Sequence, residues 1–477
     1  MTVELTGIQR MTTLKVLGAP AGVEAYQIST PGLGDHSYLI TSGGRSALID
    51  PQRDLDRFEA GIAEVHAPLD IVMETHVHND YVSGGRALAL RHNATHVLPA
   101  DAGYTFDHHA VRDEDEVPFG DLVVRALHTP GHTPHHTSYA LLDGDKPLLV
   151  FSGGCVLVAS CGRTDLISPE MTEDLTRGQY RSAQRLLSMP TTMAIGPTHG
   201  AGSFCAASAA SADTFTDVGT ELTRNPAALA RDEQDFVDTQ LAGLLAYPAY
   251  YHEMAGLNKG GADGWEPSAL PALGLNDLDR AMEQGTVVID GRSREEFATA
   301  HVPGSVNIEL DAQFATYVGW LFPFGTEFAV IVPDGIDPQE PVRQCARIGI
   351  TSIVGYLEGG FDAWQDAGRD TRSYDVIDMD ALNEIQGDGG RVLDVRQDLE
   401  WSDGHVPDAT HIHIPDVPRR ADELVGGEGT VYVMCRTGHR ASIATSILDA
   451  RGVSAVLVNG GFPDWVESGY PVDHTAD

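Results

Sequence analysis

The feature that most limits the fold of this chain is an internal repeat in its C-terminal half. VVIDGRSREEFATAHVPG begins at Val287, and VLDVRQDLEWSDGHVPD begins at Val392. Four residues of the first segment recur 104 positions later, and GGFDAW at Gly359 recurs as GGFPDW 101 positions later. The recurring residues are Asp290, Arg292, His301 and Pro303, which map onto Asp394, Arg396, His405 and Pro407. Two homologous units of about 100 residues therefore fill this half.

The remaining pattern predicts a multi-domain α/β chain. In each repeat, apolar strands end in Asp and alternate with helices, which is typical of a small parallel sheet. The N-terminal half also alternates strands with helical stretches. Residues 261–275 are rich in Gly, Pro and Ala and predict a linker. We therefore expect domains at 1–260, 276–373 and 374–477.

Charge and cysteine content narrow the classes of function. The formal net charge is −38, which argues against nucleic acid as a partner, because phosphates are bound by basic patches. No apolar run is long enough for a membrane helix, and the first residues do not resemble a signal peptide. Five irregularly spaced cysteines argue against a disulfide framework. We expect a cytoplasmic protein without a membrane partner.

Three histidine-bearing segments in the N-terminal half predict a metal site. After the apolar strand 71–73, ETHVHND places His76, His78 and Asp80 at alternate positions, so their side chains share one face of an extended segment. His132 follows in TPGHT, and His199 follows a further strand in GPTHG. Imidazoles with carboxylates suit zinc or iron, and a site with open positions would be catalytic.

These segments resemble the metallo-β-lactamase superfamily, and more narrowly the persulfide dioxygenases. The resemblance rests on THVHND, TPGHT, FSGGCVLVASCGRTDL and THG, over residues 7–258. It implies an αββα sandwich and an iron ion held by His76, His132 and an aspartate. Gly154 stands where the family has that aspartate, and Tyr81 stands where the superfamily motif ends in His. Both departures argue against a two-metal site.

A single metal is the expectation that remains. His76, His78 and His132 could form a facial set of three histidines, with Asp80 and His199 as secondary candidates. Mononuclear Fe²⁺ is the cofactor that the resemblance implies; zinc or no metal are the alternatives. Arg163, in CGRTDL, matches a family position near the active site. It would either bind an anionic thiol substrate or form a structural salt bridge.

The second repeat carries a separate candidate site. VYVMCRTGHRASIATSILDARG predicts a strand, a loop and a helix that begins near Ala441. Cys435 ends the strand, Gly438 permits a tight loop, and Arg436 and Arg440 flank the sulfur with positive charge. Backbone N–H groups at a helix N-terminus and nearby guanidinium groups both stabilise a thiolate or a persulfide.

This unit resembles a rhodanese domain, whose six-residue active-site loop matches CRTGHR. The resemblance implies that Cys435 accepts sulfur as Cys–S–SH and passes it to a second thiol. Asp394 and Arg396 are expected to organise the domain. The first repeat has PDGIDPQE where the loop should lie, and Cys345 falls in a later helix. We expect the first repeat to be a catalytically silent rhodanese fold.

Three functional hypotheses follow from these resemblances. The first joins oxidation of low-molecular-weight thiol persulfides to sulfite with sulfur transfer at Cys435. The second is a sulfurtransferase alone, with a metal-free N-terminal binding module. The third is a thioester hydrolase of the glyoxalase II type. The expected partners are a small thiol persulfide, thiosulfate or sulfite; a homodimer is left open.

Overall fold

The computed structural model describes residues 11–207, 211–387, 389–425 and 429–474. Its contacts divide the chain into two compact units. Among the described residues, the first comprises residues 11–267 together with Ala346–Gly349, and the second comprises Ser268–Cys345 and the chain from Ile350. Within the described ranges, no helix has both the length and the apolar character needed to cross a bilayer.

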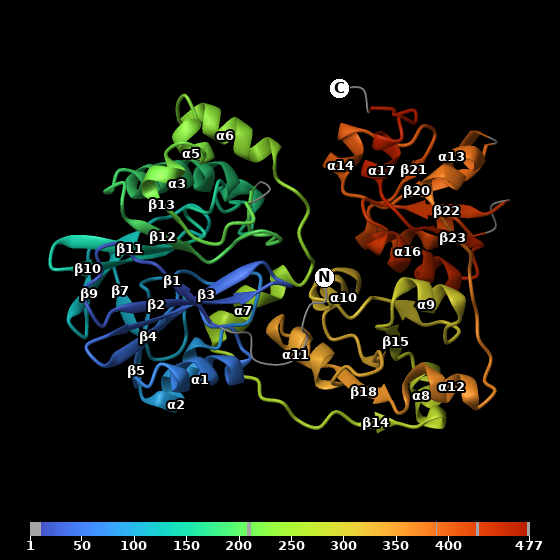
Figure 1. The fold of residues 1–477 in the computed structure, drawn as a ribbon, viewed down its shortest axis with the longest axis horizontal. Coiled ribbons are helices and arrows are strands. Elements are labelled where there is room, and N and C mark those ends of the chain that lie inside the picture. The colour runs from blue at the N-terminus through green and yellow to red at the C-terminus, as the bar shows by residue number, and fades with distance from the viewer. Residues whose placement is uncertain (1–10, 208–210, 388, 426–428, 475–477) are drawn as a thin grey trace. The chain divides into compact units, whose positions relative to one another are not determined.

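The first unit contains two β-sheets (Figure 1). The seven-stranded sheet has β1 (Thr12–Leu14), β2 (Glu24–Thr30), β3 (Asp35–Ser42), β4 (Arg45–Ile49), β5 (Leu69–Met73), β6 (Thr95–Pro99) and β7 (His109–Val111) in chain order. The six-stranded sheet runs β13 (Thr216–Asp217), β12 (Ala194–Pro197), β11 (Lys146–Gly153), β10 (Thr137–Asp143), β9 (Leu122–His128) and β8 (Glu116–Phe119). Both sheets mix parallel and antiparallel pairs.

Seven helices flank the two sheets in the described part of this unit. They are α1 (Leu55–Glu64), α2 (Gly85–His92), α3 (Pro169–Leu187), α4 (Val218–Glu221), α5 (Pro226–Leu229), α6 (Glu233–Ala242) and α7 (Tyr251–Gly260). Tyr38, Phe119 and Phe151 belong to the core that lies between the sheets. A second core joins the first sheet to α1 and α2, and a third joins the other sheet to α3 and α6. The predicted αββα sandwich is confirmed.

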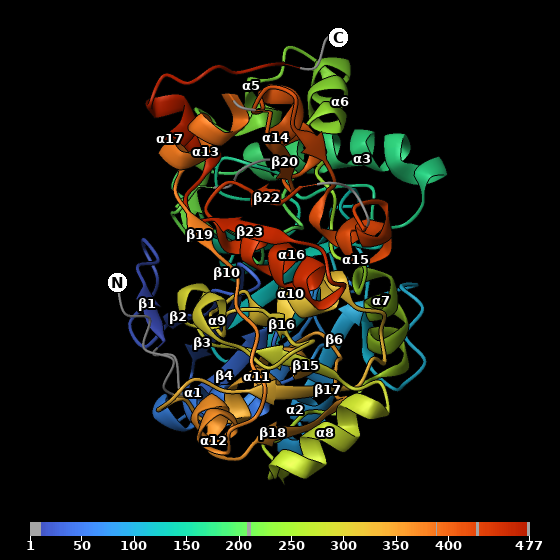
Figure 2. The same ribbon diagram turned by 90° about the vertical axis from the view of Figure 1, so that its right-hand side faces the viewer.

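The second unit contains two parallel five-stranded sheets with the same strand order (Figure 2). The first runs β14 (Ala272–Leu273), β18 (Ile353–Leu357), β17 (Phe328–Ile331), β15 (Val287–Asp290) and β16 (Val306–Asn307). The second runs β19 (Val376–Ile377), β23 (Ala455–Val458), β22 (Val431–Met434), β20 (Arg391–Asp394) and β21 (Thr410–His411). The two predicted parallel α/β units are therefore confirmed.

Short helices flank these sheets. In the first repeat they are α8 (Leu275–Glu283), α9 (Arg294–Thr299), α10 (Phe314–Leu321), α11 (Gln339–Arg347) and α12 (Gly360–Asp366). In the second they are α13 (Met379–Gly387), α14 (Asp398–Asp403), α15 (Val417–Arg420), α16 (His439–Ala450) and α17 (Phe462–Glu467), with 3-10 turns at Ile414–Asp416 and Ala421–Glu423.

The Asp and Arg residues of the repeated motif make the same packing contacts in both repeats. The Arg396 guanidinium bonds both carboxylate oxygens of Asp394 and lies 3.9 Å from the centre of the Phe462 ring. Arg292 makes the equivalent bonds to Asp290, with Phe361 as its ring partner at 3.7 Å. In each repeat an ion pair under an aromatic ring joins the strand that ends in Asp, β15 or β20, to the GGF segment. These contacts join neighbouring segments within each repeat.

Candidate metal centre and cysteine loop

Three loops of the first unit bring three buried histidines together. His76 follows β5, His132 follows β9 and His199 follows β12. Their ligand atoms lie within 4.8 Å of one another. β5 belongs to one sheet and β9 and β12 to the other, so segments far apart in the sequence meet at one point. Buried imidazoles clustered at this spacing match the needs of a single metal ion.

Hydrogen bonds fix how each imidazole is turned. Each of the three rings engages an oxygen atom through Nδ1. The partners are Thr75 Oγ1 for His76 at 2.8 Å, the Arg163 carbonyl for His132 at 2.7 Å and Asp35 Oδ1 for His199 at 2.9 Å. All three Nε2 atoms are buried without a hydrogen-bond partner. Orphaned buried nitrogens are costly unless something binds them, so these residues fit a metal ion.

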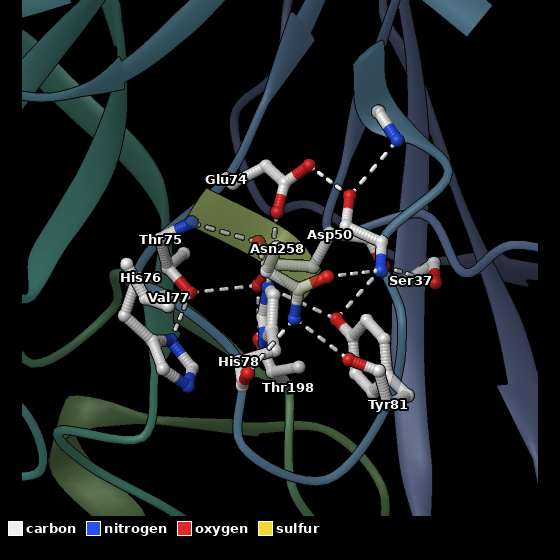
Figure 3. A network of polar contacts seen from close by, with 12 residues as sticks. Ser37, Asp50, Glu74, Thr75, His76, Val77, His78, Tyr81, Thr198 and Asn258 are labelled. Atoms are coloured by element: carbon white, nitrogen blue, oxygen red, sulfur yellow. Dashed lines mark hydrogen bonds and ion pairs between the residues drawn. The ribbon is translucent and has the colours of Figure 1, made fainter. Parts of the chain in front are cut away.

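Asp50, at the end of β4, joins two of the loops (Figure 3). It accepts hydrogen bonds from the backbone N–H and the hydroxyl of Thr75, at 2.7 and 2.8 Å, and from the Thr198 hydroxyl. Because the Thr75 proton goes to Asp50, the Thr75 oxygen is left to accept from His76 Nδ1. Burial alone would raise the pKa of Asp50, but His78 and these hydrogen bonds lower it.

His78 belongs to the Asp50 network and not to the three-histidine cluster. Its Nε2 lies 3.3 Å from Asp50 Oδ1 and 3.1 Å from the Tyr81 hydroxyl. Burial opposes a charge on His78, but Asp50 raises its pKa. The ligand atom that lies within 4.8 Å of those of His76 and His132 belongs to His199, so the candidate cluster contains His199 in the place that the sequence hypothesis gave to His78. His78 Nδ1 is also buried without a hydrogen-bond partner.

Protonation differs among the clustered rings. Burial lowers the pKa of His132 to about 3 and that of His76 well below its ordinary value, so both rings are neutral near pH 7. Burial also opposes a charge on His199, but Asp80 and Asp35 raise its pKa to about 10. Asp80 Oδ2 lies 3.3 Å from His199 Nδ1. Binding of a cation at His199 would therefore release a proton.

A second group of ligand types lies beside the first. Asp80, His199 and Cys205 also have ligand atoms within 4.8 Å of one another, and all three are buried. Asp80 Oδ2 is paired with His199, and Asp80 Oδ1 is buried without a hydrogen-bond partner. Asp80 and His199, the secondary candidates, thus both lie at the cluster, and Cys205 joins them. No sequence motif marked Cys205.

The segment that lacks the family aspartate is packed against His132. A Cβ atom at Gly154 would lie 2.3 Å from His132 Cδ2, and one at Gly162 would lie 2.8 Å from His132 Nδ1. Gly153 adopts a left-handed conformation with φ of 55°, and its Cβ would meet His136 Nε2 at 2.3 Å. The imidazole of His132 therefore fills the space into which a side chain at Gly154 would project.

The Arg163 side chain is buried and hydrogen-bonded within the protein, so it is not accessible to a substrate. Its side chain is 2% exposed and binds Asp165 through Nε and Nη2, at 2.7 and 2.8 Å. The remaining bonds go to the carbonyl oxygens of Phe204 and Leu245. These contacts favour the structural interpretation over substrate binding. Its contribution to the cluster is the backbone carbonyl that orients His132.

A small cavity adjoins the histidine loops. Its volume is about 240 Å³, and Val77, Asn79, Thr133 and Lys259 are among the residues that line it. Val77 follows His76 and Thr133 follows His132, so the cavity borders two ligand-bearing loops. The Thr133 hydroxyl is buried without a hydrogen-bond partner. A cavity of this size would hold a small polar molecule.

The loop before α2 differs from the sequence prediction. Helix α2 begins at Gly85, so the segment from His78 to Gly84 is a loop, although sequence pattern alone allows a helix from Tyr81 to Arg91. The Asn258 side chain donates to the carbonyls of His78 and Tyr81 and accepts from the Ser83 N–H. These bonds replace helical ones and keep the loop open. Asn258 is far from this loop in the sequence, so no local sequence pattern predicts these bonds.

The cysteine loop of the second repeat joins β22 to α16. Cys435 is buried directly after β22, and the Gly438 N–H donates to its Sγ at 3.2 Å. Gly438 has φ of 86°, which is why the loop needs glycine there. Helix α16 begins at His439, two residues before the predicted start, so its N-terminus lies at the loop. The expected strand, loop and helix are present.

The two arginines of this loop have different surroundings. Arg440 is paired with Glu400 through two bonds of 2.6 and 2.9 Å. Burial would lower the pKa of Arg440, but Glu400 raises it, so the guanidinium stays charged. Arg436 is exposed. Arg440 therefore supplies fixed charge near the loop, and Arg436 is the arginine that solvent or a solute can reach.

The first repeat has no comparable loop among its described residues. β17 is followed by residues 332–338 and then by α11, without a cysteine at the strand end. Cys345 is buried within α11, and burial raises its thiol pKa. A buried, protonated thiol is a poor nucleophile. The geometry agrees with a silent first repeat.

Comparisons with known proteins agree with these two architectures. The metallo-beta-lactamase superfamily model matches residues 30–199. The rhodanese-like domain model matches residues 275–367 and 378–468. The human protein "Persulfide dioxygenase ETHE1, mitochondrial" is 27% identical over 48% of this chain and 85% of its own length. A hydroxyacylglutathione hydrolase of Brucella anthropi is 28% identical over 35% of this chain and 64% of that protein.

A solved structure covers more of the chain. The metallo-beta-lactamase of Staphylococcus aureus subsp. aureus COL is 27% identical, with a TM-score of 0.64 over 70% of this chain and 99% of that one. The two family models together match most of the residues, in the order of the observed sheets. The chain is therefore a metallo-beta-lactamase superfamily domain, with persulfide dioxygenase homologues, followed by two rhodanese-like domains.

Proposed function

We propose that the first domain oxidises low-molecular-weight thiol persulfides to sulfite at one iron ion, and that Cys435 transfers sulfane sulfur. The observation that carries the first part is the set of three buried, unpartnered Nε2 atoms on His76, His132 and His199. Relatives named persulfide dioxygenases and two rhodanese-like domains support a role in sulfur metabolism.

The overall reaction needs only dioxygen and water besides the persulfide. R–S–SH, O₂ and H₂O give R–SH and H₂SO₃, so the outer sulfur is oxidised and the carrier thiol is released. Bound iron would supply the redox chemistry for dioxygen. His76, His132 and His199 would hold the ion, burial keeps the first two rings neutral, and the adjoining cavity would receive the substrate.

The rhodanese step uses Cys435 as the nucleophile. The thiolate attacks the outer sulfur of thiosulfate, forming Cys435–S–S⁻ and releasing SO₃²⁻. A second thiol R–SH then takes the outer sulfur as R–S–SH and regenerates Cys435. The Gly438 N–H, at 3.2 Å from Sγ, stabilises negative charge on the sulfur, and the N-terminus of α16 adds to that effect.

The two activities share their small molecules. The rhodanese step interconverts sulfite, thiosulfate and persulfide, and the oxidation consumes persulfide and produces sulfite. Fusion in one chain raises the effective concentration of each shared intermediate. The missing aspartate at Gly154 distinguishes this first domain from the iron-binding pattern that its sequence resembles.

A hydrolase with two metals is the second candidate. Asp80, His199 and Cys205 supply a second set of ligand types beside the three histidines, and hydroxyacylglutathione hydrolases are among the relatives. Two metals per chain and cleavage of a glutathione thioester would favour this function over persulfide oxidation.

The test measures oxygen uptake and sulfite production with glutathione persulfide, for the wild type, His132→Ala and Cys435→Ser. Persulfide-dependent oxygen uptake that is lost in His132→Ala and kept in Cys435→Ser supports the oxidation. Thiosulfate-to-cyanide sulfur transfer with the opposite pattern supports the role of Cys435. Full oxygen uptake by His132→Ala, or no uptake by the iron-loaded wild type, would refute the proposed oxidation.

A further inference from the structure

The silent rhodanese repeat makes polar contacts with the helix that follows the cysteine loop. The Asn307 N–H donates to Ser446 Oγ at 3.0 Å, and the Ser442 hydroxyl donates to Asn307 Oδ1. Arg372 binds Asp449 Oδ1 at 2.7 Å. Ser442, Ser446 and Asp449 all lie on α16, beside β16 of the silent repeat (Figure 2). The helix behind Cys435 is therefore fixed by residues of the other repeat.

Arg294 of the silent repeat contacts the cysteine loop itself. Its Nε lies 3.1 Å from Glu309 Oε1 and its Nη2 lies 2.5 Å from Oε2, so the guanidinium is held by a two-point ion pair. Its Nη1 donates to the carbonyl oxygen of Thr437 at 3.0 Å. The Arg294 side chain is only 16% exposed. A planar, two-point pair of this kind fixes the position of the third donor.

The peptide unit whose carbonyl accepts from Arg294 is also the one whose N–H donates to Cys435 Sγ. The Thr437 carbonyl and the Gly438 N–H belong to one peptide unit, and in a trans peptide these groups point in opposite directions. Arg294 binds the oxygen end, and the nitrogen end donates to Cys435 Sγ at 3.2 Å. A Cβ atom at Gly438 would lie 2.5 Å from Arg294 Nη1, so the guanidinium lies directly against this peptide.

Two physical effects follow from this arrangement. Holding the carbonyl prevents the peptide from rotating, so the N–H stays directed at the sulfur. A cation on the carbonyl also polarises the peptide and strengthens its N–H as a donor, because linked hydrogen bonds reinforce one another. Both effects stabilise negative charge on Cys435.

We propose that Arg294 is a positioning residue for Cys435, so that the repeat without a catalytic cysteine completes the active site of the other. The proposal rests on the proposed sulfur transfer at Cys435, but the role of Arg294 can be measured without it. Arg294 touches the loop backbone and not the sulfur. Glu309 has a supporting part, because it orients the guanidinium.

The test follows the thiolate of Cys435 by its ultraviolet absorbance as pH rises, as a difference from the Cys435→Ser protein. We expect Arg294→Gln to move the midpoint of this titration upward by about one pH unit, which corresponds to about a tenfold loss of thiolate below the midpoint. Arg294→Lys keeps the charge and should fall between Arg294→Gln and the wild type.

Glu295→Gln is the matched control. Glu295 is the next residue, and it also reaches the second repeat, by accepting from Asn459 Nδ2 at 2.8 Å, but it does not touch the Thr437–Gly438 peptide. Its titration should match the wild type. Superimposable curves for Arg294→Gln and the wild type would overturn the proposal, as would equal shifts in Arg294→Gln and Glu295→Gln.

Sulfur transfer is assayed separately on the same proteins. A wild type that transfers no sulfur from thiosulfate to cyanide would contradict the proposed function, while the titration, which needs no sulfur donor, would still decide the role of Arg294. A wild type that transfers sulfur, with an unshifted Arg294→Gln titration, would leave the function standing and remove the positioning role.

Discussion

Gly154 lies directly against the imidazole of His132, and a Cβ atom at Gly154 would come within 2.3 Å of His132 Cδ2. Position 154, where the persulfide dioxygenases carry an aspartate, therefore has no room for a side chain unless His132 moves. The His132 ring can take its observed position because residue 154 has no side chain.

Substitution of Gly154 should disturb the histidine cluster. Gly154→Ala forces a methyl group into the His132 ring, and overpacking of this kind costs about 1–3 kcal/mol. We expect a lower melting temperature and a lower metal content. Gly256→Ala is the control, because a Cβ there meets nothing within 4 Å and Ala favours the helix α7. Metal content unchanged in Gly154→Ala would contradict the contact. Gly154→Asp should not raise the metal content either.

Removal of the Tyr81 hydroxyl tests whether the Asp50 network can be changed without loss of metal from the histidine cluster. Tyr81 Oη lies 3.1 Å from His78 Nε2 and donates to the Asp50 carbonyl at 3.2 Å. Tyr81→Phe should lower the free energy of unfolding by about 1 kcal/mol, because buried hydrogen bonds are lost. Metal content should stay at the wild-type value. A loss of metal as large as in His199→Ala would show that His78 is a ligand.

Arg163 should matter for stability more than for substrate binding. Arg163→Gln leaves Asp165 and two carbonyl oxygens without their partner, and breaking a buried pair costs about 3 kcal/mol. Arg181→Gln removes an exposed pair with Glu233 and should cost much less than the Arg163 substitution, because solvent screens exposed ion pairs. Urea unfolding measures both. A raised KM for persulfide with unchanged stability in Arg163→Gln would instead support substrate binding.

Asp449 makes the stability of the second unit depend on pH. Burial alone would raise the pKa of Asp449, but the hydrogen bond from His301 and the Arg372 guanidinium lower it below its ordinary value of 3.8. The stabilisation is therefore present above pH 3.8 and is lost as pH falls below it. Asp449→Asn should be less stable than the wild type by about 1–2 kcal/mol at neutral pH. That difference should shrink in acid; a difference that is constant with pH would contradict the assignment.

Much of the architecture could be predicted because it depends on local patterns. The sequence repeat predicts two similar units, and the structure has two sheets with the same strand order. The recurring Asp and Arg residues form the same ion pair in each unit. The loop at Cys435 could be predicted for a similar reason. A strand, a glycine with positive φ and a helix N-terminus are all encoded within one short segment.

The candidate metal site was only partly predictable. His76 and His132 stand in motifs that predict ligands, but the choice between His78 and His199 as the third candidate depends on where Asp50 and Asp35 lie. Asp50 shares no motif with Thr198, although the two meet through a hydrogen bond. Arg294 gave no signal, because its partner peptide lies in the other repeat. Contacts between distant segments are set by tertiary packing, which spacing in the sequence does not record.

The most direct test of the account is the metal content of anaerobically purified protein, measured by mass spectrometry for the wild type, His132→Ala and His199→Ala. The orphaned Nε2 atoms predict about one iron per chain in the wild type and a large loss in both variants. Wild-type protein with no more metal than His132→Ala would contradict the account and leave Cys435 as the only reactive centre proposed for the chain.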